Sequence, residues 1–207
     1  MADIFDLFKQ ITQSTISSEP ISYLVVGLGN PGSEYSSTRH NAGFIAIDCI
    51  ARKSNCNINR AKFKGLCADT SIGGKRVLLL KPQTYMNLSG ESVLEAVEFY
   101  KIPTENIIVL CDDVNFDVGT TRIRAKGSDG GQKGMRSIIK CLGTDNIKRI
   151  KLGVGKKPTP EYDMADWVLS KFTSDEQIKL QSVAENVYDA VTLILSDSIE
   201  KAMSKYN

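Results

Sequence analysis

The fold of this chain is decided by residues 23–32, which read YLVVGLGNPG. Their first part is an apolar run rich in β-branched side chains, which predicts a buried strand over residues 23–28. A turn follows at residues 30–32, because proline presets φ and glycine tolerates a positive φ. The stretch therefore predicts a strand that stops abruptly and presents the side chain of Asn30 at its end.

Residues 27–32 also match the pattern G-x-G-x-x-G, and Asp48 follows further along. In a dinucleotide-binding fold, this loop leads directly into a helix whose N-terminus faces the pyrophosphate. Here Pro31 and Gly32 form a turn, and the polar residues 33–38 lack helical periodicity. A nucleotide-cofactor enzyme is therefore an alternative that the loop disfavours.

Short apolar runs alternate with helical patterns along the rest of the chain. Strands are predicted over residues 23–28, 65–71, 76–80, 106–111, 121–125 and 149–154, and helices over residues 42–52, 90–100, 133–142 and 175–195. Ser174 and Gln177 have the spacing of a capping box for the last helix. The alternation predicts an α/β fold in which a mixed β-sheet is flanked by helices.

The chain has 207 residues, of which 42% are hydrophobic and 24% are charged, as expected for a single globular domain. We predict that residues 22–207 form this domain. Residues 1–21 are predicted to be an N-terminal extension, either loose or containing a short amphipathic helix with Phe5, Phe8 and Ile11. The extension is acidic and lacks a long apolar core, so it does not resemble a signal peptide. No apolar run approaches the roughly 18 residues that cross a bilayer, so no membrane association is expected.

The chain contains a single histidine, His40, and five cysteines without C-x-x-C spacing. This excludes any mechanism that needs two imidazoles, and it disfavours zinc sites and redox dithiols. We therefore expect no metal. The odd number of cysteines predicts reduced, mostly buried thiols in a cytoplasmic protein.

Positive charge is concentrated in one part of the chain. Residues 120–157 hold eleven lysines and arginines but only two aspartates, a net charge of +9. The rest of the chain must then carry −7, because the total is only +2. Such a segment indicates a polyanionic partner, and its clustering suits a phosphate backbone. A solvated basic face without a partner is the alternative reading.

Four polar residues stand at predicted strand ends or in loops, where α/β folds gather their sites: Asn30, His40, Asn87 and Asp112. A glycine-rich loop at residues 127–134 precedes a helix within the basic segment. Each feature also has a structural interpretation. His40 could be a local hydrogen-bonding residue, the two asparagines could hold their loops, and Asp112 could lie in a solvated turn.

Three longer motifs resolve this choice. They read GLGNPGxxY followed by TRHNxGF at residues 27–44, KPxTYMNLSG at residues 81–90, and an Asp-Asp turn at residues 112–113 before the glycine-rich loop. In this order and spacing they resemble the signatures of bacterial-type peptidyl-tRNA hydrolases. The resemblance covers roughly residues 22–200.

The resemblance implies a three-layer fold and a monomeric enzyme whose partner is peptidyl-tRNA. The enzyme would hydrolyse the ester between a peptide and the 3′ ribose of tRNA, without a cofactor or metal. It implies that His40 is the general base and that Asp112 accepts a hydrogen bond from its other ring nitrogen. This is chemically sound, because an imidazole with a reference pKa of about 6.5 is largely neutral in the cytosol and can take a proton from water.

The resemblance also implies roles for other positions. Asn30 would recognise the acylated amino group that distinguishes peptidyl-tRNA from aminoacyl-tRNA. Asn87, Tyr35 and Tyr85 would line the groove for the peptide and the 3′ end. The tRNA 5′ phosphate would be held by basic side chains at two positions, Arg124 and Lys151.

Two positions depart from the family pattern. Gln132 and Lys133 stand where the family usually has His-Asn, and lysine has hydrogen-bond donors only. We expect Lys133 to contact substrate. Lys151 stands where arginine is common, which keeps the charge but loses the bidentate fork. A non-catalytic RNA-binding relative, similar to splicing factors with this fold, is the main alternative, although the presence of His40 and Asp112 favours catalysis.

Overall fold

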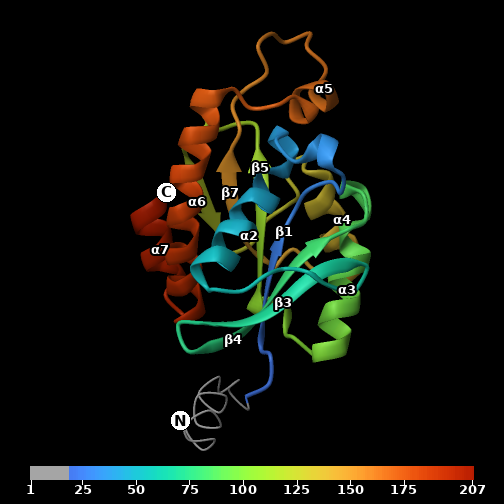
Figure 1. Cartoon of the computed structure of the whole chain (residues 1–207), viewed down its shortest axis with the longest axis vertical. Coiled ribbons are helices and arrows are strands. Elements are labelled where there is room, and N and C mark those ends of the chain that lie inside the picture. The colour runs from blue at the N-terminus through green and yellow to red at the C-terminus, as the bar shows by residue number, and fades with distance from the viewer. Residues whose placement is uncertain (1–18) are drawn as a thin grey trace, which may run out of the picture.

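The computed structural model describes residues 19–207, which form a seven-stranded sheet with helices on both faces (Figure 1). The strands are β1 Tyr23–Gly27, β2 Arg60–Lys62, β3 Gly65–Ile72, β4 Lys75–Pro82, β5 Ile107–Asp113, β6 Thr121–Arg124 and β7 Lys148–Gly153. The α-helices are α2 Ala42–Lys53, α3 Ser89–Tyr100, α4 Lys133–Leu142, α5 Met164–Leu169, α6 Ser174–Leu195 and α7 Ile199–Tyr206. The 3-10 helices are η1 Ser33–Tyr35, η2 Arg39–Asn41, η3 Met86–Leu88 and η4 Thr104–Asn106.

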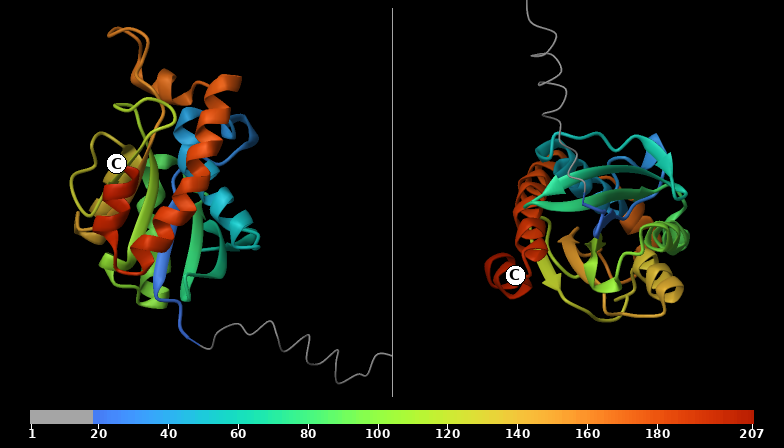
Figure 2. Two further views of the ribbon diagram at one scale, coloured as in Figure 1. Left: turned by 90° about the vertical axis from the view of Figure 1, so that its left-hand side faces the viewer. Right: turned by 90° about the horizontal axis from the view of Figure 1, so that it is seen from below.

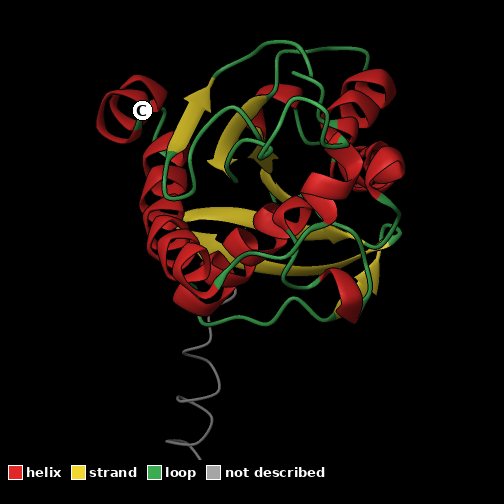
Figure 3. Cartoon of the chain, turned by 90° about the horizontal axis from the view of Figure 1, so that it is seen from above, coloured by secondary structure: helices red, strands yellow, loops and turns green. Residues whose placement is uncertain are grey.

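The sheet is mixed, as predicted, and its order is β2-β3-β4-β1-β5-β7-β6. The central strand β1 runs parallel to β4 and β5, and β5 runs parallel to β7. The outer strands β6 and β3 run antiparallel to β7 and β4. The carboxyl ends of β1, β4, β5 and β7 consequently meet at one edge, where loops and short helices lie over them (Figure 3).

Alternating side chains of the central strand define three layers (Figure 2). Val25 points into an apolar cluster that includes residues of α2 and α6. Leu24 and Val26 point into a second cluster that includes residues of α3 and α4. Because every residue of β1 is buried, the strand is apolar on both faces, as a strand covered by helices on both sides must be.

Two glycines allow α2 to pack closely on the sheet. A Cβ atom at Gly27 would lie 2.6 Å from the carbonyl oxygen of Gly43, and one at Gly43 would lie 2.4 Å from the carbonyl oxygen of Leu110. Gly27, the last residue of β1, thus serves helix packing. Within residues 27–42, all described, the first α-helix begins only at Ala42. The loop therefore lacks the helix start that dinucleotide binding requires.

The six predicted strands and four predicted helices are all present, with ends shifted by a few residues at most. One strand and two α-helices were not predicted, namely the short β2, α5 and α7, and neither were the four 3-10 helices. The predicted capping box is wrong by one residue. Thr173, not Ser174, is the N-cap of α6, and it exchanges hydrogen bonds with Glu176. Thr173 and Glu176 thus form the capping box, and Glu176 is also held by Arg39, at 2.8 Å.

The predicted helix containing Phe5, Phe8 and Ile11 lies outside the described residues, and the division between residues 1–21 and 22–207 stays a prediction. Within residues 19–207, none of the helices has the length and apolar character needed to cross a membrane.

Candidate active site

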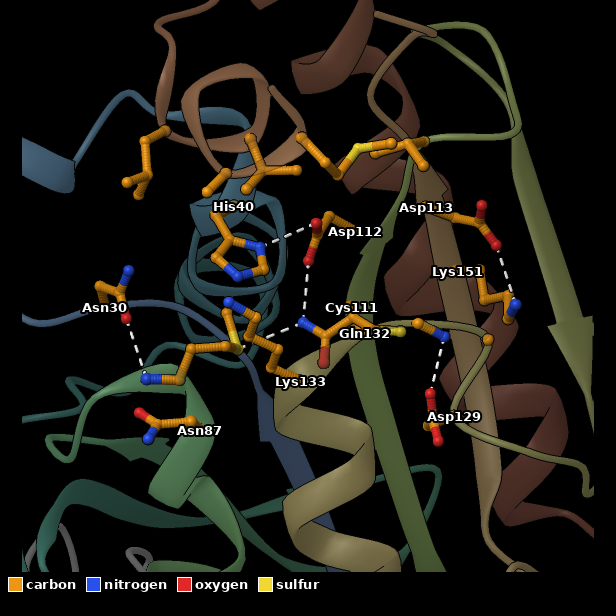
Figure 4. A pocket seen from close by; sticks show the side chains of 18 of the residues that line it. Asn30, His40, Asn87, Cys111, Asp112, Asp113, Asp129, Gln132, Lys133 and Lys151 are labelled. Atoms are coloured by element: carbon orange, nitrogen blue, oxygen red, sulfur yellow. Dashed lines mark hydrogen bonds and ion pairs between the residues drawn. The ribbon is translucent and has the colours of Figure 1, made fainter. Parts of the chain in front are cut away.

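A cavity of about 1050 Å³ opens where the carboxyl ends of the parallel strands meet (Figure 4). Seven of the nine site residues predicted from the sequence line it: Asn30, His40, Tyr85, Asn87, Asp112, Lys133 and Lys151. The other two, Tyr35 and Arg124, lie outside it. Tyr35 is half-buried in η1, and Arg124 is exposed at the end of β6. The fold thus assembles most of the predicted site from six separate segments.

His40 and Asp112 form a buried pair at the floor of this cavity. His40 lies in η2, directly before α2, and Asp112 lies near the end of β5. Nδ1 of His40 is 2.8 Å from Oδ2 of Asp112, which is the hydrogen bond expected from the sequence. His40 is 7% exposed and Asp112 is 5% exposed. Because Nδ1 is engaged, Nε2 is the ring nitrogen available to a molecule in the cavity; it has no partner among residues 19–207.

Asn30 is held in one orientation by two neighbours. Its Oδ1 accepts a hydrogen bond from the backbone N–H of Met86 at 2.9 Å. The side chain of Asn41 holds the backbone of Asn30. It donates to the Asn30 carbonyl at 3.0 Å and accepts from the Asn30 N–H at 2.9 Å. Since the amide oxygen is engaged, Asn30 offers its NH₂ group to the cavity as a donor. Asn41 was not assigned a role from the sequence, although it lies in the motif that contains His40.

Gln132, which the sequence marks only as a departure from the family's His-Asn, is a further residue at the site. Its Nε2 donates to Oδ1 of Asp112 at 3.0 Å, the carboxylate oxygen that His40 does not use. Its Oε1 accepts from the backbone N–H of Met135 at 2.7 Å and so caps the N-terminus of α4. Glutamine is not among the residues favoured at N-caps, so the sequence offered no signal for this role.

Lys151 and Asp113 form an ion pair on the cavity wall, with Nζ and Oδ2 2.8 Å apart. Burial alone would raise the pKa of Asp113, but hydrogen bonds from Lys151 and Asn115 outweigh it and hold this pKa below its ordinary value. The glycine-rich loop passes close by, since a Cβ atom at Gly130 would lie 3.4 Å from the Lys151 ammonium. The ammonium group therefore lies between Asp113, at the end of β5, and this loop.

Some cations of the basic segment, residues 120–157, already have partners within the protein. Arg149 is 1% exposed and donates to the backbone carbonyls of residues 127, 128, 145 and 147, so it holds the glycine-rich loop. Burial lowers its pKa. Arg136 pairs with Asp129 at 3.1 Å. These two arginines therefore have structural partners, whereas Arg124, Lys126 and Lys133 are exposed.

The pairing of β6 with β7 places the predicted phosphate residues on one face. Arg124 lies opposite Arg149, and Arg122 lies opposite Lys151. Residues two apart on a strand share a face, so Arg124 and Lys151 lie on the same side of this strand pair. Ile123 and Ile150, on the other side, belong to the core.

The upper wall of the cavity is formed by α5, which contributes Met164, Ala165, Val168 and Leu169 (Figure 1). Arg39, the neighbour of His40, connects this wall to the rest of the site. Its guanidinium lies 3.9 Å from the centroid of the Trp167 ring in α5. It also donates to both carboxylate oxygens of Glu176, at 2.9 and 2.8 Å. The wall and the segment that contains His40 are thus linked through one buried arginine.

Cys111 precedes Asp112 in β5 and is 1% exposed. Burial is the main cause that raises the pKa of its thiol to about 12. The thiolate, which is the nucleophilic form, is therefore scarce at neutral pH. Among residues 19–207, no group of three or more histidine, cysteine or acidic side chains is placed to hold a metal ion.

Comparison with known proteins agrees with this geometry. The model of the peptidyl-tRNA hydrolase family matches residues 24–207. The peptidyl-tRNA hydrolase of Caldicellulosiruptor bescii is 49% identical over 187 residues, covering 90% of this chain and 97% of that protein. That of Lachnospira eligens is 50% identical over 185 residues, covering 89% and 99%. The crystal structure of peptidyl-tRNA hydrolase from Acinetobacter baumannii is similar with a TM-score of 0.83 at 35% identity, covering 91% of this chain and 96% of that one.

Proposed function

The chain belongs to the peptidyl-tRNA hydrolase family, and from this premise we propose that it hydrolyses the ester bond of peptidyl-tRNA, releasing free tRNA and peptide. The observation that carries the proposal is the buried His40–Asp112 pair, whose free ring nitrogen faces a cavity of about 1050 Å³. A histidine oriented by a carboxylate is the arrangement that hydrolytic enzymes use to activate a nucleophile.

In the proposed reaction, Nε2 of His40 takes a proton from water as the water oxygen attacks the ester carbonyl carbon. Asp112 keeps the other ring proton on Nδ1 and stabilises the imidazolium that forms. The tetrahedral intermediate then collapses and breaks the bond to the 3′ oxygen of the ribose. His40 returns its proton to that oxygen, so the products are a free 3′-hydroxyl and a peptide carboxylic acid, which then loses its proton to solvent.

We propose that the NH₂ group of Asn30 donates to the acyl carbonyl that marks an N-blocked amino acid. The fixed orientation of its amide supports this role. Asn87 and the 62% exposed Tyr85 lie at the cavity rim, where they would contact the peptide and the 3′ end. Tyr35 would contact the substrate outside the cavity. Lys133 also lines the cavity, and as a donor it would contact a carbonyl or phosphate oxygen.

We assign binding of the tRNA 5′ phosphate to Lys151 and Arg124, which share one face of the β6–β7 pair. Phosphate would compete with Asp113 for the Lys151 ammonium. We further propose that the protein acts as a monomer in the cytoplasm, where translation supplies its substrate.

The direct test uses the wild-type chain with N-acetyl-aminoacyl-tRNA and with the matching unblocked aminoacyl-tRNA. The proposal predicts rapid release of tRNA from the first substrate and much slower release from the second. Tight tRNA binding without release would instead identify a non-catalytic RNA-binding relative. Equal rates on both substrates would show that the protein does not recognise the acyl group.

A further inference from the structure

We propose that Gln132 is a positioning residue for this hydrolysis, acting through Asp112 rather than on the substrate. The inference rests on the proposed function, because it concerns how the base of that reaction is held. The side-chain amide of Gln132 lies between two parts of the site. Gln132 links the helix that closes the glycine-rich loop, α4, to the carboxylate that orients His40 (Figure 4).

Both ends of the Gln132 amide are used, and they cannot be exchanged. Oε1 must accept from the backbone N–H of Met135, 2.7 Å away. Nε2 must donate to Oδ1 of Asp112, 3.0 Å away. A flipped amide would place a donor against an N–H and an acceptor against a carboxylate. The hydrogen-bonding partners therefore fix the orientation of the group.

Packing restricts the same side chain. The Gln132 Nε2 also lies 3.2 Å from Sδ of Met86. A Cβ atom at Gly134 would lie 2.6 Å from that sulfur and 3.0 Å from Oε1 of Gln132. Glycine at position 134 thus leaves the space in which both side chains fit. Gln132 is held by contacts on several sides.

The consequence is that Asp112 is anchored through both of its oxygens. Oδ2 contacts His40 and Oδ1 contacts Gln132. Rotation of the carboxylate would break both hydrogen bonds together, so the carboxylate plane and the histidine ring are set as a unit. Donation from a neutral amide satisfies this oxygen without adding a competing charge.

The charges around this unit come from several elements. Asp113 and Cys111 flank Asp112 on β5, Lys151 lies opposite Cys111 on β7, and Lys133 follows Gln132 on α4. Lys151 is already paired with Asp113. Because glutamine does not titrate, it adds no ionisation of its own to the pH dependence of the reaction.

The substitution Gln132→Glu separates the two roles of the residue. A glutamate keeps an oxygen for the Met135 N–H, so it preserves the cap of α4, but it replaces the donor to Asp112 with a second carboxylate. We expect kcat near neutral pH to fall at least about tenfold while KM changes less than about threefold. The added negative charge should also shift the midpoint of the His40 titration to higher pH.

His40 is the only histidine of the chain, so its ring proton signal in an untagged protein reports this midpoint without ambiguity. The measurement needs no substrate. It therefore tests the Gln132 contact even if the wild-type chain fails to release tRNA, a result that would overturn the proposed function alone. An unchanged midpoint together with wild-type kcat would overturn the role of Gln132.

A second comparison covers the case in which the glutamate variant folds poorly. Gln132→Met removes both hydrogen bonds without adding charge, and it is measured alone and in the Asp112→Asn background. If Gln132 acts through Asp112, the loss in kcat should be at least about tenfold in the wild-type background and under about twofold in the double variant. Equal losses in both backgrounds would show that Gln132 acts only as a structural cap.

Discussion

Nδ1 of His40 lies 2.8 Å from Oδ2 of Asp112, although the two residues are 72 positions apart in the chain. One is placed by the short helix before α2 and the other by the end of β5, two elements that pack around the central strand. The contact fixes which ring nitrogen carries the proton and leaves Nε2 for water. Most of the expected chemistry depends on this one distance.

The first prediction concerns Asp112→Asn. An amide at this position can donate to Nδ1, which favours the tautomer with the proton on Nε2 and so removes the base. We expect kcat to fall by about 10²-fold or more, with KM nearly unchanged, because general-base catalysis contributes about 10²–10⁴-fold. Steady-state hydrolysis of N-acetyl-aminoacyl-tRNA measures both constants. A kcat within threefold of wild type would show that the carboxylate is dispensable.

A second prediction concerns substrate selection by Asn30. In Asn30→Asp, one carboxylate oxygen can still accept from the Met86 N–H, but the donor to the acyl carbonyl is lost. We expect kcat/KM for the N-blocked substrate to fall about tenfold to a hundredfold, as the loss of one hydrogen bond predicts. Hydrolysis of unblocked aminoacyl-tRNA should fall less, because the new carboxylate attracts its ammonium group.

Exposed Asn59, which lies outside the cavity, provides the matched control. Asn59→Asp changes the net charge by the same amount and should leave both rates as they are. If Asn30→Asp reduces the two rates by one common factor, Asn30 does not read the acyl group.

A third prediction concerns the phosphate site. Arg124→Ala and Lys151→Ala should each weaken tRNA binding and flatten its salt dependence. A variant that lacks one phosphate contact releases fewer counterions when it binds. Binding is measured by titration at several salt concentrations. The control is Lys75→Ala, at an exposed lysine that begins β4. This substitution should preserve the slope of binding against salt concentration. A slope identical to wild type in either site variant would exclude that residue from the phosphate site.

A fourth prediction concerns stability in acid. Burial alone would raise the pKa of Glu176, but hydrogen bonds from Arg39 and Thr173 outweigh it and lower this pKa. The stabilisation is therefore complete above the unfolded value of about 4.3 and is lost as the pH falls through the lower folded value. Asp113 and Asp129 are shifted in the same direction.

Thermal unfolding between about pH 3 and pH 7 tests this assignment. Glu176→Gln should lower Tm at neutral pH, and the difference from wild type should shrink as the solution becomes more acidic. A Tm difference of constant size across this range would mean that the Arg39–Glu176 ion pair does not contribute to stability.

The main framework of the fold was predictable because its patterns are local. The apolar run after residue 22 and the 3.6-residue stripe of α6 each indicate one type of element. Strand β2, with the sequence Arg-Ala-Lys, is too short and polar to show a period, and the six-residue α5 has no buried face. The register of the mixed sheet depends on contacts between distant segments, so only the structure shows it.

The sequence predicted those site residues that lie in recognisable motifs, and it did not predict the roles of the others. His40, Asp112 and Asn30 lie in those motifs, and the fold brings all three to one cavity. Gln132 was noted only as a departure from the family pattern, because its role depends on the distance to a carboxylate on strand β5. Arg149 was counted in the charge of the basic segment, yet it is buried, and a charge count does not distinguish a solvated side chain from one that holds a loop.

The central claim is that His40 is the general base, and the most direct test is His40→Ala. Turnover of N-acetyl-aminoacyl-tRNA and affinity for tRNA are measured on the same preparation, with Tm as the control for folding. We expect at least about a 10²-fold loss of turnover, as removal of a general base predicts, while tRNA binding is retained. Equal turnover by His40→Ala and the wild type would contradict this account.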